Sequence, residues 1–518
     1  MEFKYKSVEE MSVQELIGQL IMVGLPSTSL DEEYKKFIND YKIGNFILFA
    51  RNYTNTVQMK KFMEELYDYT YNVTGSFPLV SIDQEGGMVV RMFKDVTFPA
   101  SPLTTSATNV KDAPYHTGYI IGKDMLKLGV NLNLAPCLEI NEGLANHLVN
   151  VRGYGATKEI VLQNAGKFVD GIQDSGALSC LKHFPGAGSS TKDTHLELSL
   201  IEDDRETLLN YNMYPFLKLL RSDALMSSHC IFKSFEEVPT TLSYEILTNV
   251  LRKEVNYEGL IISDGMEMKA ILDHYGIAGG TVKALQAGCD ILLLCHDYDF
   301  QKEALDAVKE AIDNGDLSIE LIKEKVRRIN KAKEKLRNGL EKHFTKEEYV
   351  ISDEEHQYMQ NVVDESYTLV KGKAPYLNDK TLIITPKAIV RSIVEDEFDS
   401  RDLTKSMRKA FPNNDVVEFK NDFEFVDEIL NISKNYENIL IYSYDAYNDE
   451  VQKETINKLL EDNQNVYVVS IKGPTDQQYF RGLVNYACLY EYTPNSIRTI
   501  IKQLKEKFEF KGKLPLRS

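Results

Sequence analysis

The chain of 518 residues lacks an excess of positive charge. Its 60 lysines and arginines are outnumbered by 78 aspartates and glutamates, which gives a formal net charge of -18 and an isoelectric point near 5.1. Phosphate backbones and anionic lipid headgroups repel such a chain, so we expect no binding to nucleic acid and none to a membrane surface. The acidic residues are spread along the chain rather than gathered in a tail.

Long apolar runs and paired cysteines are also absent. No run approaches the roughly 18 apolar residues of a membrane-spanning helix, and Met1–Glu10 lacks the pattern of an export signal. The six cysteines form no Cys-x-x-Cys pair, which indicates reduced, buried thiols and a cytoplasmic protein. The alternative that an export signal was removed from a longer precursor stays open. No His-x-x-x-His or similar spacing is present, so we expect no metal site.

Short apolar runs alternate with amphipathic segments over the first three hundred residues. Alternation at this pace predicts a parallel sheet, and eight repeats fit a (β/α)8 barrel, which typically takes about 250 residues or more. An open doubly wound sheet is the competing architecture, although it usually has fewer strands. The eight runs are Leu20–Gly24, Asn45–Ala50, Leu79–Asp83, Val130–Ala135, Ala177–Lys182, Ala224–Ser228, Leu260–Asp264 and Asp290–Cys295.

A second α/β pattern follows the barrel. The charged segment Ile319–Lys342 predicts a solvated linker helix, and apolar runs resume at Thr381–Thr385 and continue to Ala487–Tyr490. We therefore predict an α/β protein of two domains: a catalytic (β/α)8 barrel with its linker helix over residues 1–340, and a smaller parallel-sheet domain over residues 354–518.

The stretch from Leu181 to His195 carries the strongest chemical signal. It begins at the end of an apolar run and places Lys182, His183, Asp193 and His195 in one loop rich in Gly, Pro and Ser. Only one residue separates Asp193 from His195, so an extended segment would point both side chains to the same side. A carboxylate beside an imidazole orients the ring and stabilises its protonated form. His195 is therefore a candidate proton shuttle.

Polar residues follow other runs as well, as expected at the carboxyl ends of barrel strands. Asp83 and Arg91 follow the third run, Arg152 lies in the connection after the fourth, and Asp264 ends the seventh. Each has a simpler interpretation alone, since an Asp at a strand end is often a helix N-cap. His229 and His296 are interpreted as structural or substrate-lining residues, and Met266–Met268 as core or pocket wall.

Together these residues indicate a site for a polyhydroxylated neutral ligand such as a sugar. Asp264 as nucleophile and His195, held by Asp193, as acid and base would support glycoside hydrolysis by double displacement. Two other classes stay open. A barrel lyase or aldolase would use Lys182 as a Schiff-base nucleophile, and a sugar-binding protein would have lost turnover.

Four ordered motifs resemble glycoside hydrolase family 3, and within it the bacterial β-N-acetylglucosaminidases. The resemblance covers roughly residues 10–340, and the later pattern, with Val468–Pro474, resembles the family's second, αβα sandwich domain. The Asp-x-His loop distinguishes this branch from the β-glucosidases. The motifs are Asp83-Gln-Glu-Gly-Gly with Arg91, Arg152-Gly-Tyr-Gly155, Lys182-His-Phe-Pro-Gly with Asp193-Thr-His195, and Ile262-Ser-Asp-Gly-Met-Glu-Met268.

The resemblance implies a role for each matching residue. Asp264 matches the catalytic nucleophile, His195 the general acid and base, and Asp193 its partner. The residues that match the N-acetylglucosamine-binding positions are Asp83, Arg91, Arg152, Lys182 and His183. A retaining exo-β-N-acetylglucosaminidase without a cofactor is implied, acting on a cell-wall fragment such as a muropeptide. A β-N-acetylglucosaminide phosphorylase and another family 3 glycosidase stay open, and the sequence carries no signal for oligomeric state.

Several positions depart from the family pattern. Gly186–Ser190 stands where the family usually has Gly-His-Gly-Asp-Thr, with the loop length from Lys182 to His195 unchanged. Met88 stands where Arg is usual, Glu139 where Asp is usual, and Gly265 where Ala is common. These departures concern leaving-group preference and rate more than reaction type.

Overall fold

A computed structural model describes residues 3–141, 149–187, 199–387, 402–462 and 465–516. Its first part is a closed barrel of eight parallel strands in the order β1-β10-β9-β7-β5-β4-β3-β2. Each of the eight predicted runs supplies one of these strands, so the barrel prediction is confirmed. The strands are β1 (Ile21–Gly24), β2 (Asn45–Leu48), β3 (Leu79–Ile82), β4 (Leu132–Asn133), β5 (Leu178–Phe184), β7 (Ala224–Ser227), β9 (Leu260–Gly265) and β10 (Ile291–Leu294).

Helices surround the barrel, and local signals fix where they begin and end. The side chains of Asp31, Asn55 and Thr157 accept N–H groups of the first turns that follow them. The helices outside the barrel are α1 (Val13–Gly18), α2 (Glu32–Tyr41), α3 (Thr56–Thr74), α4 (Pro102–Ala107), α5 (Ala113–Lys127), α6 (Lys158–Ser175), α7 (Arg205–Thr207), α8 (Tyr214–Lys218), the π-helical η6 (Glu245–Glu254), α9 (Lys269–Ala287) and α10 (Tyr298–Asn314). A small sheet pairs β6 (Leu200–Ile201) with β8 (Ile231–Phe232).

The prediction of a solvated linker helix is wrong. The helix exists as α11 (Ile319–His343), but one face of it is buried against the barrel through residues such as Ile322, Val326, Ile329 and Leu336. These positions recur at the three- and four-residue spacing of an amphipathic helix. The many lysines and arginines between them obscured this apolar stripe.

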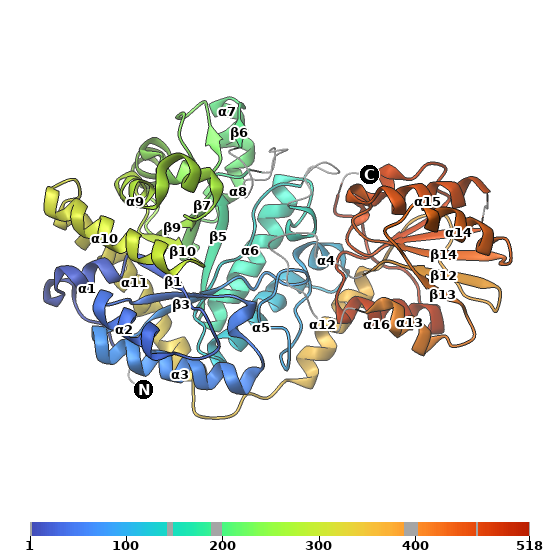
Figure 1. Cartoon of the computed structure of the whole chain (residues 1–518), viewed down its shortest axis with the longest axis horizontal. Coiled ribbons are helices and arrows are strands. Elements are labelled where there is room, and N and C mark those ends of the chain that lie inside the picture. The colour runs from blue at the N-terminus through green and yellow to red at the C-terminus, as the bar shows by residue number, and fades with distance from the viewer. Residues whose placement is uncertain (1–2, 142–148, 188–198, 388–401, 463–464, 517–518) are drawn as a thin grey trace.

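The second domain is a six-stranded sheet covered by helices, as Figure 1 shows in orange and red. Its strand order is β11-β16-β15-β14-β12-β13. The predicted parallel pairing holds for five of its strands, and the edge strand β11 departs from it because it pairs antiparallel with β16. The strands are β11 (Thr368–Lys371), β12 (Thr381–Thr385), β13 (Val416–Glu418), β14 (Asn438–Ser443), β15 (Val466–Ser470) and β16 (Asn485–Cys488); the helices are α12 (Asp353–Ser366), α13 (Leu403–Ala410), α14 (Glu424–Ser433), α15 (Glu450–Asp462) and α16 (Pro494–Glu506).

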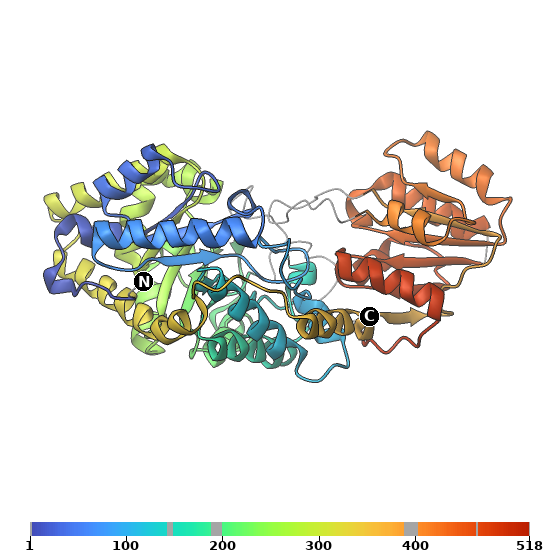
Figure 2. The ribbon, with the colours of Figure 1, turned by 90° about the horizontal axis from the view of Figure 1, so that it is seen from below.

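The two domains pack side by side, and the views of Figures 1 and 2 agree on this. α12 contacts both α4 and α5 of the barrel domain. The apolar core of the second domain continues into the first, where it includes the buried Met88, Leu103 and Val151. All six cysteines are buried and unpaired, as predicted. Among the described residues, no helix has the length and apolar character needed to cross a membrane.

Candidate active site

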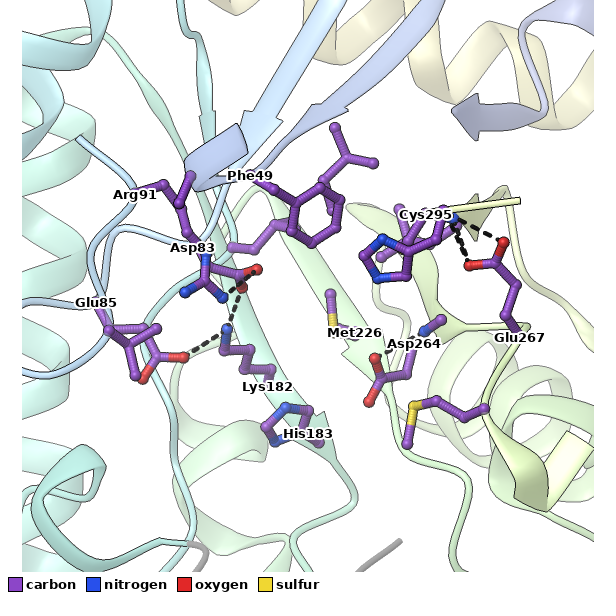
Figure 3. Close-up of a pocket in the computed structure, with 18 of the residues that line it drawn as sticks. Phe49, Asp83, Glu85, Arg91, Lys182, His183, Met226, Asp264, Glu267 and Cys295 are labelled. Carbon is purple, nitrogen blue, oxygen red and sulfur yellow. Dashed lines mark hydrogen bonds and ion pairs between the residues drawn. The ribbon is translucent and has the colours of Figure 1, made fainter. Parts of the chain in front are cut away.

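A cavity of about 600 Å³ opens at the carboxyl ends of the barrel strands. All six predicted site residues in the described part of the chain line it, and Asp264 lies across from Asp83, Arg91 and Lys182 (Figure 3). Barrel enzymes place their chemistry at this end of the strands. The structure therefore brings together Asp83, Arg91, Arg152, Lys182, His183 and Asp264.

Lys182 is the centre of a buried ionic network. Its Nζ lies 2.6 Å from Asp83 Oδ1 and 2.7 Å from Glu85 Oε1. Arg152 completes the network through Nε and Nη2, which donate to the two oxygens of Glu85 at 2.9 and 2.8 Å. This fork geometry fixes both side chains, since a guanidinium and a carboxylate match in two parallel hydrogen bonds.

The network keeps all of its members charged. Burial by itself would raise the pKa of Asp83 and of Glu85, but the neighbouring cations outweigh burial and hold both pKa values below their usual range. For the same reason the two carboxylates raise the pKa of Lys182, although burial opposes its charge. A ligand in the cavity therefore meets fixed donors and acceptors, which suits the hydroxyl groups of a sugar.

The charged state of Lys182 also bears on the lyase and aldolase hypothesis. A Schiff-base lysine must lose its proton to attack a carbonyl carbon, and enzymes achieve this by lowering its pKa. Lys182 shows the opposite shift and is held between two carboxylates. The geometry therefore disfavours Lys182 as a nucleophile.

The loop between Asp83 and Arg91 is held by a side chain that sequence reasoning did not single out. Gln84 Oε1 accepts from the backbone N–H groups of Arg91 and Met92 at 2.9 and 3.2 Å, and its Nε2 donates to the Met92 carbonyl at 3.0 Å. This fold of the loop returns Arg91 to within 3.6 Å of the Asp83 carboxylate. Gln84 therefore fixes the conformation of this loop through its side-chain hydrogen bonds. Its neighbour Glu85 belongs to the site, although the sequence analysis did not include it.

His183 is oriented by Glu139. Glu139 Oε1 lies 2.8 Å from both the backbone nitrogen and Nδ1 of His183. Because a carboxylate only accepts, Nδ1 carries the proton and Nε2 is the nitrogen left for a ligand. The longer Glu at a position where the resemblance leads one to expect Asp still reaches the ring.

Glu139 and His183 also belong to the one group of potential metal ligands among the described residues. Cys137 completes it, and the three ligand atoms lie within 4.8 Å of one another. Burial raises the pKa of the Cys137 thiol despite the opposing effect of the nearby Arg152 cation, which disfavours the thiolate that binds metals. We interpret the group as support for the His183 ring rather than as a metal site.

Asp264 lies on β9, one residue before its end. Its Oδ1 accepts from the Gly265 N–H at 2.7 Å, which fixes the orientation of the carboxylate toward the cavity (Figure 3). The helix that follows, α9, begins after Met268, so the N-cap interpretation of Asp264 is wrong. His229 supports the strand end, because its Nε2 donates to the Gly265 carbonyl at 2.9 Å. His229 is therefore structural, as predicted.

Another group of cavity-lining residues, around Arg51 and His296, was not predicted to lie together. Arg51 Nη1 lies 2.9 Å from His296 Nδ1, and the Arg51 guanidinium stacks over the Phe49 ring at 4.5 Å. Glu267 accepts the backbone N–H groups that follow β10, among them those of Cys295 and His296. Phe49 lies at the end of the second apolar run and Arg51 follows that run directly, so strand-end position was the signal that could have found them. His296 lines the cavity, as predicted.

Two predicted residues lie outside the described part of the chain. These are Asp193 and His195, together with most of the departure from the family loop at Gly186–Ser190. Their place relative to Asp264 stays a prediction. The described beginning of this connection, through Ala187, follows β5 next to His183.

Comparison with known proteins agrees with this geometry. Residues 12–332 match the family described as Glycosyl hydrolase family 3 N terminal domain. A solved structure of a glycoside hydrolase family 3 β-N-acetylglucosaminidase from Paenibacillus sp. str. FPU-7 is 30% identical, with a TM-score of 0.89 over 98% of this chain and 99% of that chain. The second domain is therefore part of the shared architecture.

Two curated relatives match mainly the barrel. A β-hexosaminidase from Alkalilimnicola ehrlichii is 30% identical over 309 residues, which are 58% of this chain and 86% of that protein. β-Hexosaminidase A from Pseudoalteromonas piscicida is 29% identical over 335 residues, which are 60% of this chain and 56% of that protein. The family match spans more than half of the chain and includes every described residue of the predicted site. The chain belongs to glycoside hydrolase family 3.

Proposed function

We propose that this glycoside hydrolase is a retaining exo-β-N-acetylglucosaminidase that releases terminal β-linked N-acetylglucosamine. One observation carries the proposal: a single cavity joins the Asp264 carboxylate to the fixed donors and acceptors around Lys182. The names of the relatives that share the barrel, β-hexosaminidase and β-N-acetylglucosaminidase, support it. The cavity volume of about 600 Å³ leaves room for a sugar and part of its aglycone.

The proposed mechanism is a double displacement. Asp264 attacks the anomeric carbon while His195 protonates the departing glycosidic oxygen, which breaks the glycosidic bond and forms a glycosyl ester. The neutral His195 then removes a proton from water, the water oxygen bonds to the anomeric carbon, and the ester bond to Asp264 breaks. Asp193 would stabilise the imidazolium that donates the proton in the first step and forms again when water is deprotonated in the second. Two inversions at one carbon retain the β configuration.

The described residues supply binding and orientation for this reaction. Asp83, with its pKa held low, and the Lys182 and Arg91 cations offer charged partners to sugar hydroxyls. His183 presents Nε2 because Glu139 holds Nδ1. These groups are fixed before the substrate arrives, which limits the cost of orienting them in the transition state.

The substrate class and location form part of the proposal. A cell-wall fragment such as a muropeptide is the proposed natural glycoside, processed in the cytoplasm. Six unpaired thiols support a reducing compartment.

The test is release of sugar from an aryl β-N-acetylglucosaminide, with the stereochemistry of the first product followed by NMR. We expect hydrolysis with β-N-acetylglucosamine as the first product. Release of the α anomer first would refute the double displacement. Formation of the sugar phosphate when inorganic phosphate is added would identify a phosphorylase, and binding of N-acetylglucosamine without turnover would identify a sugar-binding protein.

A further inference from the structure

The two backbone segments that present the Glu85–Arg152 pair both lie against the second domain. Glu85 belongs to the loop after β3, and Arg152 ends the short 3-10 turn η3 (Asn150–Arg152). These segments are far apart in sequence and are joined by this ion pair. Contacts that hold these two segments in place therefore also hold Glu85 and Arg152, which line the sugar pocket.

The loop after β3 turns on Gly86 and Gly87, which both have positive φ angles of 103° and 60°. It packs tightly on the strip Pro99–Ser101: Gly87 N–H donates to the Pro99 carbonyl at 2.9 Å, and a Cβ at Gly86 would lie 2.2 Å from the Ala100 carbonyl oxygen. The position of the turn beside Glu85 therefore depends on the Pro99–Ser101 strip against which it packs.

Glu491 of the second domain holds this strip. It follows β16, is fully buried, and its Oε2 accepts from the Ser101 backbone N–H at 2.7 Å and from the Thr104 hydroxyl at 2.8 Å. Its Oε1 accepts from the Thr493 hydroxyl at 2.7 Å, so both oxygens are engaged. The Ser101 hydroxyl donates in turn to the Tyr490 carbonyl at 3.0 Å. The Glu491 carboxylate therefore links the second domain to the Pro99–Ser101 strip by hydrogen bonds.

Met88 adds a second attachment of the same loop. Its side chain is buried in the apolar core of the second domain, and its Sδ accepts from the Tyr492 N–H at 3.2 Å. An arginine, the residue usual in the family, would bring a charge into this apolar core, and burying a charge is costly. The departure at Met88 thus fits a loop that is anchored in the second domain.

The turn that carries Arg152 is also held by contacts with the second domain. Val151 is buried in the apolar core of the second domain, and Gly473, after β15, lies against the turn. A Cβ at Gly473 would lie 3.0 Å from Asn150 Oδ1 and 3.3 Å from Val151 Cγ1. Because Gly473 also has a φ of 89°, a side chain at this position would meet both strain and contact.

We propose that Glu491 is a positioning residue for the sugar pocket, through which the second domain holds Glu85, and with it Arg152, Lys182 and Asp83, in the geometry that binds N-acetylglucosamine. The inference rests on the proposed function. Glu491 does not touch the sugar, and its effect passes through the Pro99–Ser101 strip and the Gly86-Gly87 turn.

The test uses the whole chain with Glu491→Ala and Glu491→Gln, and measures the Kd for N-acetylglucosamine by calorimetry, kcat and KM on an aryl β-N-acetylglucosaminide, and the Tm. Gln has the shape of Glu, and its carbonyl oxygen can accept from Ser101 and Thr104 while its amide donates to Thr493. Asp364→Ala is the matched control, because Asp364 is a buried carboxylate of α12 whose partners Gln360, Thr499 and Lys502 all lie in the second domain.

We expect Glu491→Ala to raise Kd and KM roughly tenfold or more with a smaller change in kcat, since a misplacement of about 1 Å far from the chemistry is costly. Glu491→Gln should restore wild-type values. Asp364→Ala should lower the Tm and leave KM unchanged. If Glu491→Ala does not fold, Thr104→Val, which removes one of the three hydrogen bonds, should shift Kd in the same direction by a smaller factor.

Wild-type Kd and KM in Glu491→Ala, or an equal rise of KM in Asp364→Ala, would overturn the proposal. Absence of N-acetylglucosamine binding by the wild type would instead refute the proposed function, so the two failures are distinguishable.

Discussion

Two buried lysines at opposite ends of the same barrel differ in their partners. Lys182 is 2% exposed at the carboxyl ends of the strands and contacts Asp83 and Glu85. Lys333 of α11 is 0% exposed near the amino end of β1, where its Nζ donates to Gln19 Oε1 at 2.8 Å. The two carboxylates raise the pKa of Lys182, whereas burial lowers the pKa of Lys333 to about 7.

The difference separates a functional end of the barrel from a structural end. Charge at the carboxyl end is compensated, so it is retained and is available to a ligand. Lys333, at the amino end, has the Gln19 amide oxygen and the Phe77 ring as partners but no carboxylate among the described residues, so its charge costs stability. Removing the charge of Lys182 should therefore lower activity, whereas removing the charge of Lys333 should change stability and leave activity nearly unaltered.

The largest effect should come from Asp264→Asn at the functional end. We expect kcat on an aryl β-N-acetylglucosaminide to fall by roughly three orders of magnitude or more, because the amide cannot form the glycosyl ester. Asp273→Asn, at an exposed position of α9, is the control and should keep wild-type kcat. Substantial activity in Asp264→Asn, measured under initial-rate conditions, would remove Asp264 from the mechanism.

Lys182→Met should have the next largest effect. It leaves two buried carboxylates with fewer cations, so we expect a loss of about 3–5 kcal/mol of stability and at least a roughly hundredfold drop in kcat/KM. Chemical denaturation and steady-state kinetics measure the two quantities. A variant as stable and as active as the wild type would show that the network around Lys182 is not required.

His195→Ala tests the residue that the structure does not describe. On an aryl glycoside with a good leaving group, we expect a loss smaller than that of Asp264→Asn, since the departing oxygen needs little protonation. On an alkyl glycoside the loss should be larger. His274→Ala, at an exposed position, provides the control. Equal losses on both substrates would argue against His195 as the acid.

The smallest effect on activity should come from Lys333→Met, the matched partner of Lys182→Met. The pKa of Lys333 is lower in the folded chain, about 7, than in the unfolded chain. Burial of Lys333 therefore lowers the free energy of unfolding most below about pH 7, where the folded lysine is charged. The free energy of unfolding rises between about pH 7 and pH 10, because the folded lysine has lost its proton while the lysine of the unfolded chain still holds one. Lys333→Met should flatten this rise and stabilise the chain by about 2 kcal/mol at pH 7. Unchanged pH dependence of the free energy of unfolding would show that Lys333 stays charged in the fold.

The sequence predicts the barrel well because each strand is a short apolar run bounded by polar residues, from Leu20–Gly24 to Asp290–Cys295. It fails where tertiary contacts decide. The edge strand β11 has a mixed pattern and forms by pairing with β16, more than a hundred residues later. The buried face of α11 was hidden among its charges.

The same limit applies to the site. Strand-end position finds Asp83, Lys182 and Asp264, because a parallel barrel collects strand ends at one rim. It does not find Glu491, whose bond to Ser101 joins residues 390 positions apart. Nor does spacing explain why Glu139 faces His183, since that contact depends on how β4 and β5 pair and how their loops continue.

The most direct measurement is to trap the covalent intermediate. The wild-type chain would be incubated with a 5-fluoro glycosyl fluoride of N-acetylglucosamine, which forms the glycosyl ester faster than it loses it, and digested for peptide mass spectrometry. The account predicts one added glycosyl group on the peptide that contains Asp264, with labelling slowed by excess N-acetylglucosamine. A glycosyl group on any other residue, or turnover without a trapped intermediate, would contradict it.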